Sequence, residues 1–129
     1  MSPMLRDASF AAFIPVSDLA IARAFYESTL GLAVLEESPY AVVLDAMGAT
    51  LRLTQVADLR VQPFTIAGWQ VPDIKMVIDS LTAIGVAFTR YDAMDQDERG
   101  IWTTPRGDQV AWFTDPDGNT LSLTMFAPS

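Results

Sequence analysis

Two short stretches decide the fold of this chain: GATLRLT at residues 48–54 and GNTLSLT at residues 118–124. Each begins at a glycine and then alternates polar residues with leucine, the pattern of a strand that buries one face. A second matching pair lies upstream, VSDL at residues 16–19 and VPDI at residues 71–74. Because both pairs occur in the same order, we interpret the chain as two tandem copies of one module.

Each copy contains one predicted helix. The first begins at Ser17-Asp18 and ends at Gly31, and the second begins at Pro72-Asp73 and ends at Gly85. Ser17 is a good N-cap for the first helix, with Asp18 as an acidic residue in its first turn, and a glycine after the last apolar residue is the usual C-cap. The second helix has its apolar residues on one stripe, which predicts burial of that face: Ile74, Val77, Ile78, Leu81 and Ile84.

Strand-like runs surround the two helices. They cover residues 10–16, 32–36, 40–45 and 50–56 in the first copy, and 65–71, 86–91, 100–104, 110–114 and 120–126 in the second. The matching helix starts are offset by 55 residues and the matching last strands by 70, so the second copy holds 15 additional residues, which we place in residues 91–108. The prediction is an α+β chain, residues 1–129 as a single domain, with module one at 8–56, a linker at 57–64 and module two at 65–126.

The order of these elements resembles the vicinal oxygen chelate superfamily, which includes glyoxalase I, extradiol dioxygenases and bleomycin resistance proteins. The resembling motifs are PVSDL at 15–19, AFY at 24–26, LGL at 30–32 and WFTDPDGN at 112–119. The likeness covers nearly the whole chain. It implies two βαβββ modules whose strands form a curled mixed sheet around a cleft, and a homodimer that completes the cleft.

The same resemblance implies a degenerate metal site. The family's metal enzymes place one ligand on each of four strands, and counting from the motifs brings these positions to Ala11, Arg52, Ile66 and Ser122. Alanine and isoleucine offer no lone pair, serine is a poor ligand, and arginine repels a cation. The chain contains no histidine and no cysteine. We therefore expect no metal and no cofactor, and Ser-His or Cys-His catalysis is excluded.

An acidic group in the inserted segment lacks the calcium-loop pattern: Asp92, Asp95, Asp97 and Glu98. We expect a solvated loop there, with a weak calcium site as the alternative. Strand alternation should turn a polar set of side chains away from the helices and into the cleft. The predicted ligand-binding residues are Ala11, Phe13, Arg52, Ile66, Gln70, Trp102, Trp112 and Ser122, with Gly68 beside them. Core packing is the alternative for the two tryptophans, and an internal ion pair is the alternative for Arg52.

Composition excludes several partners. The net charge of −8, with only eight Lys and Arg residues, argues against a nucleic-acid partner, although it could steer a cationic ligand. No apolar run is long enough to cross a membrane, and no signal peptide is evident. The absence of cysteine fits a cytoplasmic protein.

The leading functional hypothesis is a metal-free protein, not an enzyme, that binds a small aromatic or amphiphilic molecule in its cleft. One alternative is a metal-independent enzyme of the same superfamily, a lyase, isomerase or oxygenase-like protein, that uses Tyr26, Tyr40 or Tyr91 for acid–base chemistry. Another is a regulatory module without a ligand. A metal-dependent glyoxalase or dioxygenase ranks last, because the expected ligand residues are missing.

Overall fold

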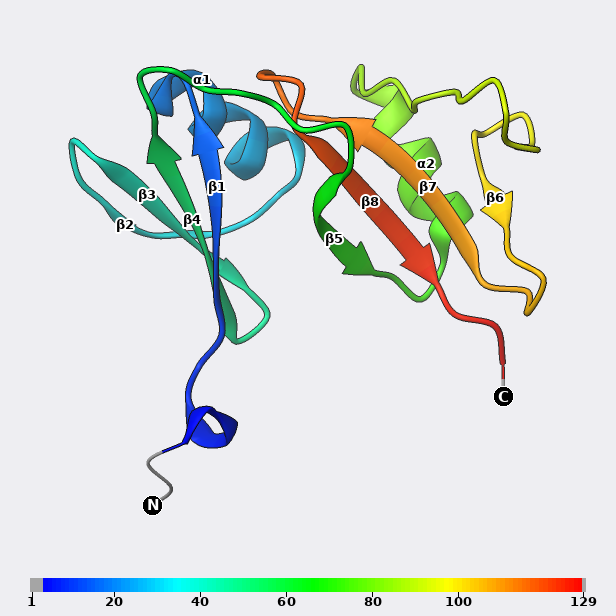
Figure 1. Cartoon of the computed structure of the whole chain (residues 1–129), viewed down its shortest axis with the longest axis horizontal. Coiled ribbons are helices and arrows are strands. Elements are labelled where there is room, and N and C mark those ends of the chain that lie inside the picture. The colour runs from blue at the N-terminus through cyan, green and yellow to red at the C-terminus, as the bar shows by residue number, and fades with distance from the viewer. Residues whose placement is uncertain (1–3, 129) are drawn as a thin grey trace. The chain divides into compact units, whose positions relative to one another are not determined.

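In the computed structural model, which describes residues 4–128, the chain divides between Arg60 and Val61 into two units (Figure 1). The first unit contains a 3-10 turn, η1 (Leu5–Asp7), and then β1 (Ala11–Val16), α1 (Leu19–Arg23), the π-helical turn η2 (Ala24–Thr29), β2 (Val34–Glu37), β3 (Ala41–Ala46) and β4 (Ala49–Gln55). The second contains β5 (Thr65–Gln70), α2 (Ile74–Ala83), β6 (Trp102–Thr103), β7 (Gln109–Thr114) and β8 (Thr120–Met125). We call them the first and second modules.

Each module has a four-stranded mixed sheet with the same topology. The strand orders are β1-β4-β3-β2 and β5-β8-β7-β6. The first strand of each module runs parallel to the last, and the remaining pairs are antiparallel, so β8 lies between β5 and β7 (Figure 1). The α+β prediction with two βαβββ modules is confirmed, because equivalent segments of the two repeats occupy equivalent strands.

Both helices begin close to the predicted positions, but the N-cap of the first is Asp18 and not the expected Ser17. The Asp18 carboxylate accepts a hydrogen bond from the backbone N–H of Ile21, and the Asp73 carboxylate accepts one from that of Met76, each at 3.1 Å. Gly31 and Gly85 adopt φ values of 80° and 102°, the left-handed conformation that a terminating glycine supplies.

The first helix differs from the expected regular α-helix. After Arg23 it widens into the π-helical turn η2, in which the backbone N–H of Leu30 donates to the carbonyl of Phe25, five residues earlier. In this turn Phe25 packs edge-on against Tyr26 with ring centroids 5.3 Å apart, and Tyr26 is completely buried. Two adjacent aromatic side chains therefore occupy the widened turn, which periodicity alone did not reveal.

The predicted strand at residues 86–91 is wrong, because only Phe88 pairs there, in an isolated bridge with Phe113. The side chain of Gln96 takes the backbone groups that a strand partner would use. It donates to the carbonyl of Thr89 and accepts from the N–H of Tyr91, at 3.0 and 2.8 Å. The edge strand is thus interrupted after Phe88 and resumes as β6.

Alternation along the strands holds in both sheets. Leu51 and Leu53 of β4 and Leu121 and Leu123 of β8 are buried with the rest of the core. Burying a leucine side chain contributes about 1.5–3 kcal/mol, so these positions specify the register of each last strand. The opposite face of each sheet carries the polar and aromatic side chains considered below. No described helix is long and apolar enough to span a membrane.

Hydrogen bonds within the turn close the β7–β8 hairpin. The Asp115 carboxylate accepts from the backbone N–H groups of Asp117 and Asn119 and from the Asn119 amide, at 2.9–3.0 Å. Asp115 is 4% exposed, and Gly118 takes a φ of 91° at the tip. The Asp115 carboxylate therefore holds this turn together.

Candidate functional site

The open face of the first sheet, away from its buried leucines, is built around Phe13 and Arg52. The two residues are partners in the parallel β1–β4 register. The Arg52 guanidinium carbon lies 5.8 Å from the centroid of the Phe13 ring, within the range of a cation–π contact. Phe13 is 65% exposed, whereas Arg52 is half-buried. The guanidinium is therefore held on this face by an aromatic ring that is itself open to solvent.

The internal ion pair considered as an alternative for Arg52 is absent from residues 4–128. Within that range no carboxylate or other acceptor bonds its guanidinium. Ala11, the predicted first-strand position, is exposed and pairs with Thr50 on the same face. The first module thus brings Ala11, Phe13 and Arg52 to one surface and leaves the N–H donors of Arg52 available.

The equivalent face of the second sheet is more closed. Ser122 is buried and pairs with Gly68, where an added Cβ would lie only 2.3 Å from the Ser122 Oγ. The absence of a side chain at Gly68 therefore makes room for the Ser122 hydroxyl. Gln70 is exposed further along β5. Ile66 lies where the β5–β8 register shifts, so the alternation that predicted its direction does not apply there.

Three aromatic residues gather on the second module. The indole rings of Trp102 and Trp112 have centroids 6.4 Å apart and planes inclined by 31°, and the Tyr91 ring stands at 88° to Trp112 with centroids 5.5 Å apart. Both tryptophans are half-buried, whereas the neighbours of Trp112 in β7, Ala111 and Phe113, are completely buried on the helix side. The tryptophans thus lie outside the main core. Sequence reasoning named Tyr91 only as an acid–base candidate and missed its place in this cluster.

The inserted loop that carries Tyr91 is ordered by side-chain bonds. Gln96 donates to the carbonyls of Thr89 and Gly100, and the Arg90 guanidinium donates to the carbonyls of Asp97 and Glu98. These bonds replace the strand hydrogen bonds that the insertion interrupts.

The expectation of a solvated acidic loop is wrong for Asp97. This carboxylate is half-buried and accepts from the backbone N–H groups of Arg99 and Ile101, each at 2.9 Å. The Arg99 guanidinium also grips the Asp79 carboxylate on α2 with two bonds of 2.9 and 3.1 Å. These bonds hold the pKa of Asp79 below its usual value. The insertion is therefore fastened to its own module's helix.

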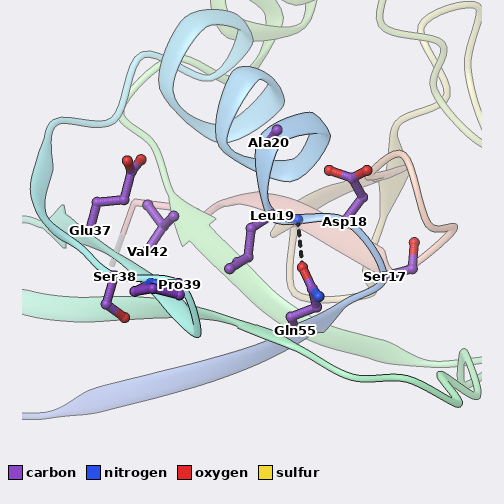
Figure 2. Close-up of a pocket in the computed structure, with 9 residues that line it drawn as sticks. All are labelled: Ser17, Asp18, Leu19, Ala20, Glu37, Ser38, Pro39, Val42 and Gln55. Atoms are coloured by element: carbon purple, nitrogen blue, oxygen red, sulfur yellow. Dashed lines mark hydrogen bonds between the residues drawn. The ribbon is translucent and has the colours of Figure 1, made fainter.

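A pocket of about 430 Å³ lies in the first module near the start of α1 (Figure 2). Its polar groups already serve the fold: Asp18 caps α1, Glu37 pairs with Arg23, and the Gln55 side-chain oxygen accepts from the N–H of Leu19 at 3.4 Å. None of the predicted ligand-binding residues is among those that line it: Ser17, Asp18, Leu19, Ala20, Glu37, Ser38, Pro39, Val42 and Gln55.

The residues at the family's ligand positions do not fit a metal. Ala11 and Ile66 have no donor atom, Arg52 is cationic, and the Ser122 hydroxyl is packed against Gly68. Elsewhere in the part of the chain that the structure describes, no group of three or more His, Cys, Asp or Glu side chains is placed to hold an ion. The donor chemistry therefore supports no metal-centred step.

Of the tyrosines considered for metal-independent catalysis, Tyr26 is completely buried in the first module, and Tyr40 is 79% exposed at the turn between β2 and β3. Tyr91 packs on Trp112. The structure thus places the three tyrosines in three different surroundings.

Comparison with solved structures shows the same fold in many proteins. The chain is similar to a lactoylglutathione lyase from Agrobacterium tumefaciens, with 16% identity, a TM-score of 0.72, and 92% of this chain and 93% of that chain covered. It is also similar to a member of the glyoxalase/bleomycin resistance protein/dioxygenase superfamily from Sphaerobacter thermophilus, with 25% identity, a TM-score of 0.70, and 95% and 100% covered.

No curated protein matches the chain. The family model of the Glyoxalase/Bleomycin resistance protein/Dioxygenase superfamily matches residues 9–123, which include every strand and both helices except the last residues of β8. With the shared topology of the two modules, this match shows that the chain belongs to the Glyoxalase/Bleomycin resistance protein/Dioxygenase superfamily.

Proposed function

We propose that this protein binds a small aromatic or amphiphilic molecule without a metal, and that Arg52 holds an acidic or carbonyl oxygen of that molecule. The observation that carries the proposal is the position of the Arg52 guanidinium on the open face of the first sheet, beside the exposed Phe13 ring and without an acceptor among residues 4–128.

The chemistry of the pair suits such a ligand. A guanidinium presents parallel N–H donors that match a carboxylate in bidentate fashion. The Phe13 ring offers apolar area next to the guanidinium. Because this ring already restricts the Arg52 side chain, Arg52 loses less conformational entropy when a ligand binds. An aromatic carboxylate would thus meet a charge and an apolar surface at the same place.

The Arg52→Ala variant tests the proposal. We expect a folded protein that binds benzoate more weakly by about 1.5–3 kcal/mol, the range for a hydrogen bond to a charged group. Binding is followed by NMR shifts of the backbone amides of β1 and β4, with benzyl alcohol as the uncharged probe. Arg52→Lys should restore binding only in part, because it lacks the planar fork.

Arg106→Ala is the matched control, since it removes one exposed arginine from the second module and should leave benzoate binding unchanged. Equal shifts with benzoate and benzyl alcohol, or equal benzoate affinity in the wild type and Arg52→Ala, would refute the proposed role of Arg52.

We propose that the purified protein carries no stoichiometric transition metal. The residues at the family's ligand positions lack suitable donors, as described for Ala11, Ile66, Arg52 and Ser122. Elemental analysis should find far less than one Zn, Fe, Ni or Mn per chain. A chelator should leave the melting temperature unchanged, whereas a drop of many degrees would show that a metal stabilises the native state.

We also propose a homodimer, as the resemblance to this superfamily implies. Large apolar side chains that are more than half exposed support it, among them Phe10, Phe13, Tyr40 and Phe64. Multi-angle light scattering should give twice the chain mass of 14.1 kDa. A mass of one chain at high concentration would contradict the proposal.

A further inference from the structure

We infer that Tyr91, Trp102 and Trp112 form a binding site for a small organic cation, an alkylated ammonium group, on the second module. This inference goes beyond the proposed function and does not depend on Arg52. It rests on the mutual angles of the three rings, on the side chains that share their sheet face, and on the bonds that hold Tyr91 in place.

The sheet register brings the two indoles together. Trp102 on β6 pairs with Val110, and Val110 and Trp112 lie two residues apart on β7, so the tryptophans are diagonal neighbours on one face. Tyr91 reaches Trp112 from the inserted loop and stands perpendicular to it. The planes of Tyr91 and Trp112 therefore form a corner, and both residues are partly exposed to solvent.

The shape of this corner favours a compact cation over a flat ring. A planar ligand can stack between two aromatic side chains only if their ring faces are parallel and about 7 Å apart. This distance is the upper end of the centroid separations seen for rings that pack on each other. The planes of Trp102 and Trp112 are inclined by 31° with ring centroids 6.4 Å apart, and Tyr91 is perpendicular to Trp112, so neither pair offers two parallel faces. An alkylated ammonium group is nearly spherical and can contact two perpendicular ring faces at once, with favourable cation–π energy at each.

The charges of the chain agree with a cationic occupant. The β5, β7 and β8 residues on the sheet face of Trp112 are uncharged, among them Gly68, Gln70, Val110, Thr114, Thr120, Ser122 and Thr124. Arg90 is the cation nearest to Tyr91 in sequence, and its guanidinium donates to the carbonyls of Asp97 and Glu98. The net charge of −8 would draw a cation toward the protein over longer distances.

The position of Tyr91 is fixed before any ligand arrives. Its backbone N–H donates to the Gln96 side chain at 2.8 Å, and the same side chain is held by the carbonyls of Thr89 and Gly100. Tyr91 is nevertheless 38% exposed, so part of its ring is open to solvent. Because the aromatic corner is already ordered, less conformational entropy is lost when a ligand binds to it.

The test compares choline with 3,3-dimethylbutan-1-ol, which has the same shape and no charge. Both are titrated into the full-length ¹⁵N-labelled protein while the three indole N–H resonances are recorded. We expect choline to shift the Trp102 and Trp112 signals saturably. Trp69 serves as an internal reference, because it pairs with Leu123 on the opposite face of the sheet and should not respond. The neutral isostere should cause little change.

Variants separate the aromatic corner from a general apolar patch. Tyr91→Leu should weaken choline binding about threefold to tenfold, whereas Tyr91→Phe should keep it, because only the ring face is needed. Arg52→Ala should leave choline binding unchanged, so the two proposals can fail separately. The inference is overturned if choline gives no saturable shift, if the neutral isostere binds equally well, or if Tyr91→Leu binds choline like the wild type.

Discussion

Replacing Asp115 by alanine is expected to destabilise the protein by about 3–4 kcal/mol, because three donors lose a buried charged acceptor at once. The Asp115 carboxylate accepts from two backbone N–H groups and from the Asn119 amide, all within 3.0 Å, and Asn119 is only 2% exposed. Water cannot readily replace the lost acceptor at such a buried position. The hairpin between β7 and β8 should therefore lose the bonds that fix its turn.

Urea denaturation followed by circular dichroism measures the change in the free energy of unfolding. Asp115→Asn should lose less than Asp115→Ala, since its side-chain oxygen can still accept from the backbone, although its amide group then faces the donor of Asn119. Asp95→Ala removes an exposed carboxylate and should stay within about 0.5 kcal/mol of the wild type. If Asp115→Ala were as stable as this control, the turn would not depend on the carboxylate.

Replacing Gln96 by alanine is expected to make opening of the inserted loop easier by about 2–4 kcal/mol, since three hydrogen bonds of a half-buried side chain are removed together. The loop is not part of the strand ladder, so we expect local opening rather than unfolding of the second module. The Tyr91 ring should then lose its fixed angle to Trp112, and choline binding should weaken in the same variant.

Hydrogen exchange at the Tyr91 amide reports this opening directly. Exchange there should accelerate by about thirtyfold to several hundredfold in Gln96→Ala, the equivalent of the expected free-energy change. The amides of β8 should keep their protection. Gln70→Ala, a glutamine on the exposed edge of β5, is the matched control and should leave exchange at Tyr91 unchanged. Unchanged exchange in Gln96→Ala would show that other contacts order the loop.

The sequence alone determined the features that depend on a few neighbouring residues. The starts of both helices were recognised from short polar residues before an apolar stripe, although the cap of the first is Asp18 and not Ser17. The alternation in residues 48–54 and 118–124 assigned the buried leucines correctly, since side chains of a strand point to opposite faces in turn. The two modules followed from the repetition of these local signals, whereas the βαβββ topology and the superfamily were implied by the resemblance of the motifs at 15–19, 24–26, 30–32 and 112–119.

Only the tertiary structure decided the features that depend on partners distant in the chain or on deviations from regular geometry. Ile66 was assigned a direction by alternation, but the register shift in β5 breaks that rule. Ser122 was predicted as a ligand-binding residue, and it is packed into the space left by Gly68 on another strand.

The sequence predicts a strand at residues 86–91, yet Gln96 bonds to the Thr89 carbonyl and the Tyr91 N–H, and the Tyr91 ring packs on Trp112. Composition and periodicity reflect only the apolar or polar character of each residue along the chain. They do not indicate which side chain will bond to a backbone group five to seven residues away, because the bonding partner depends on how the sheet and the loop pack together.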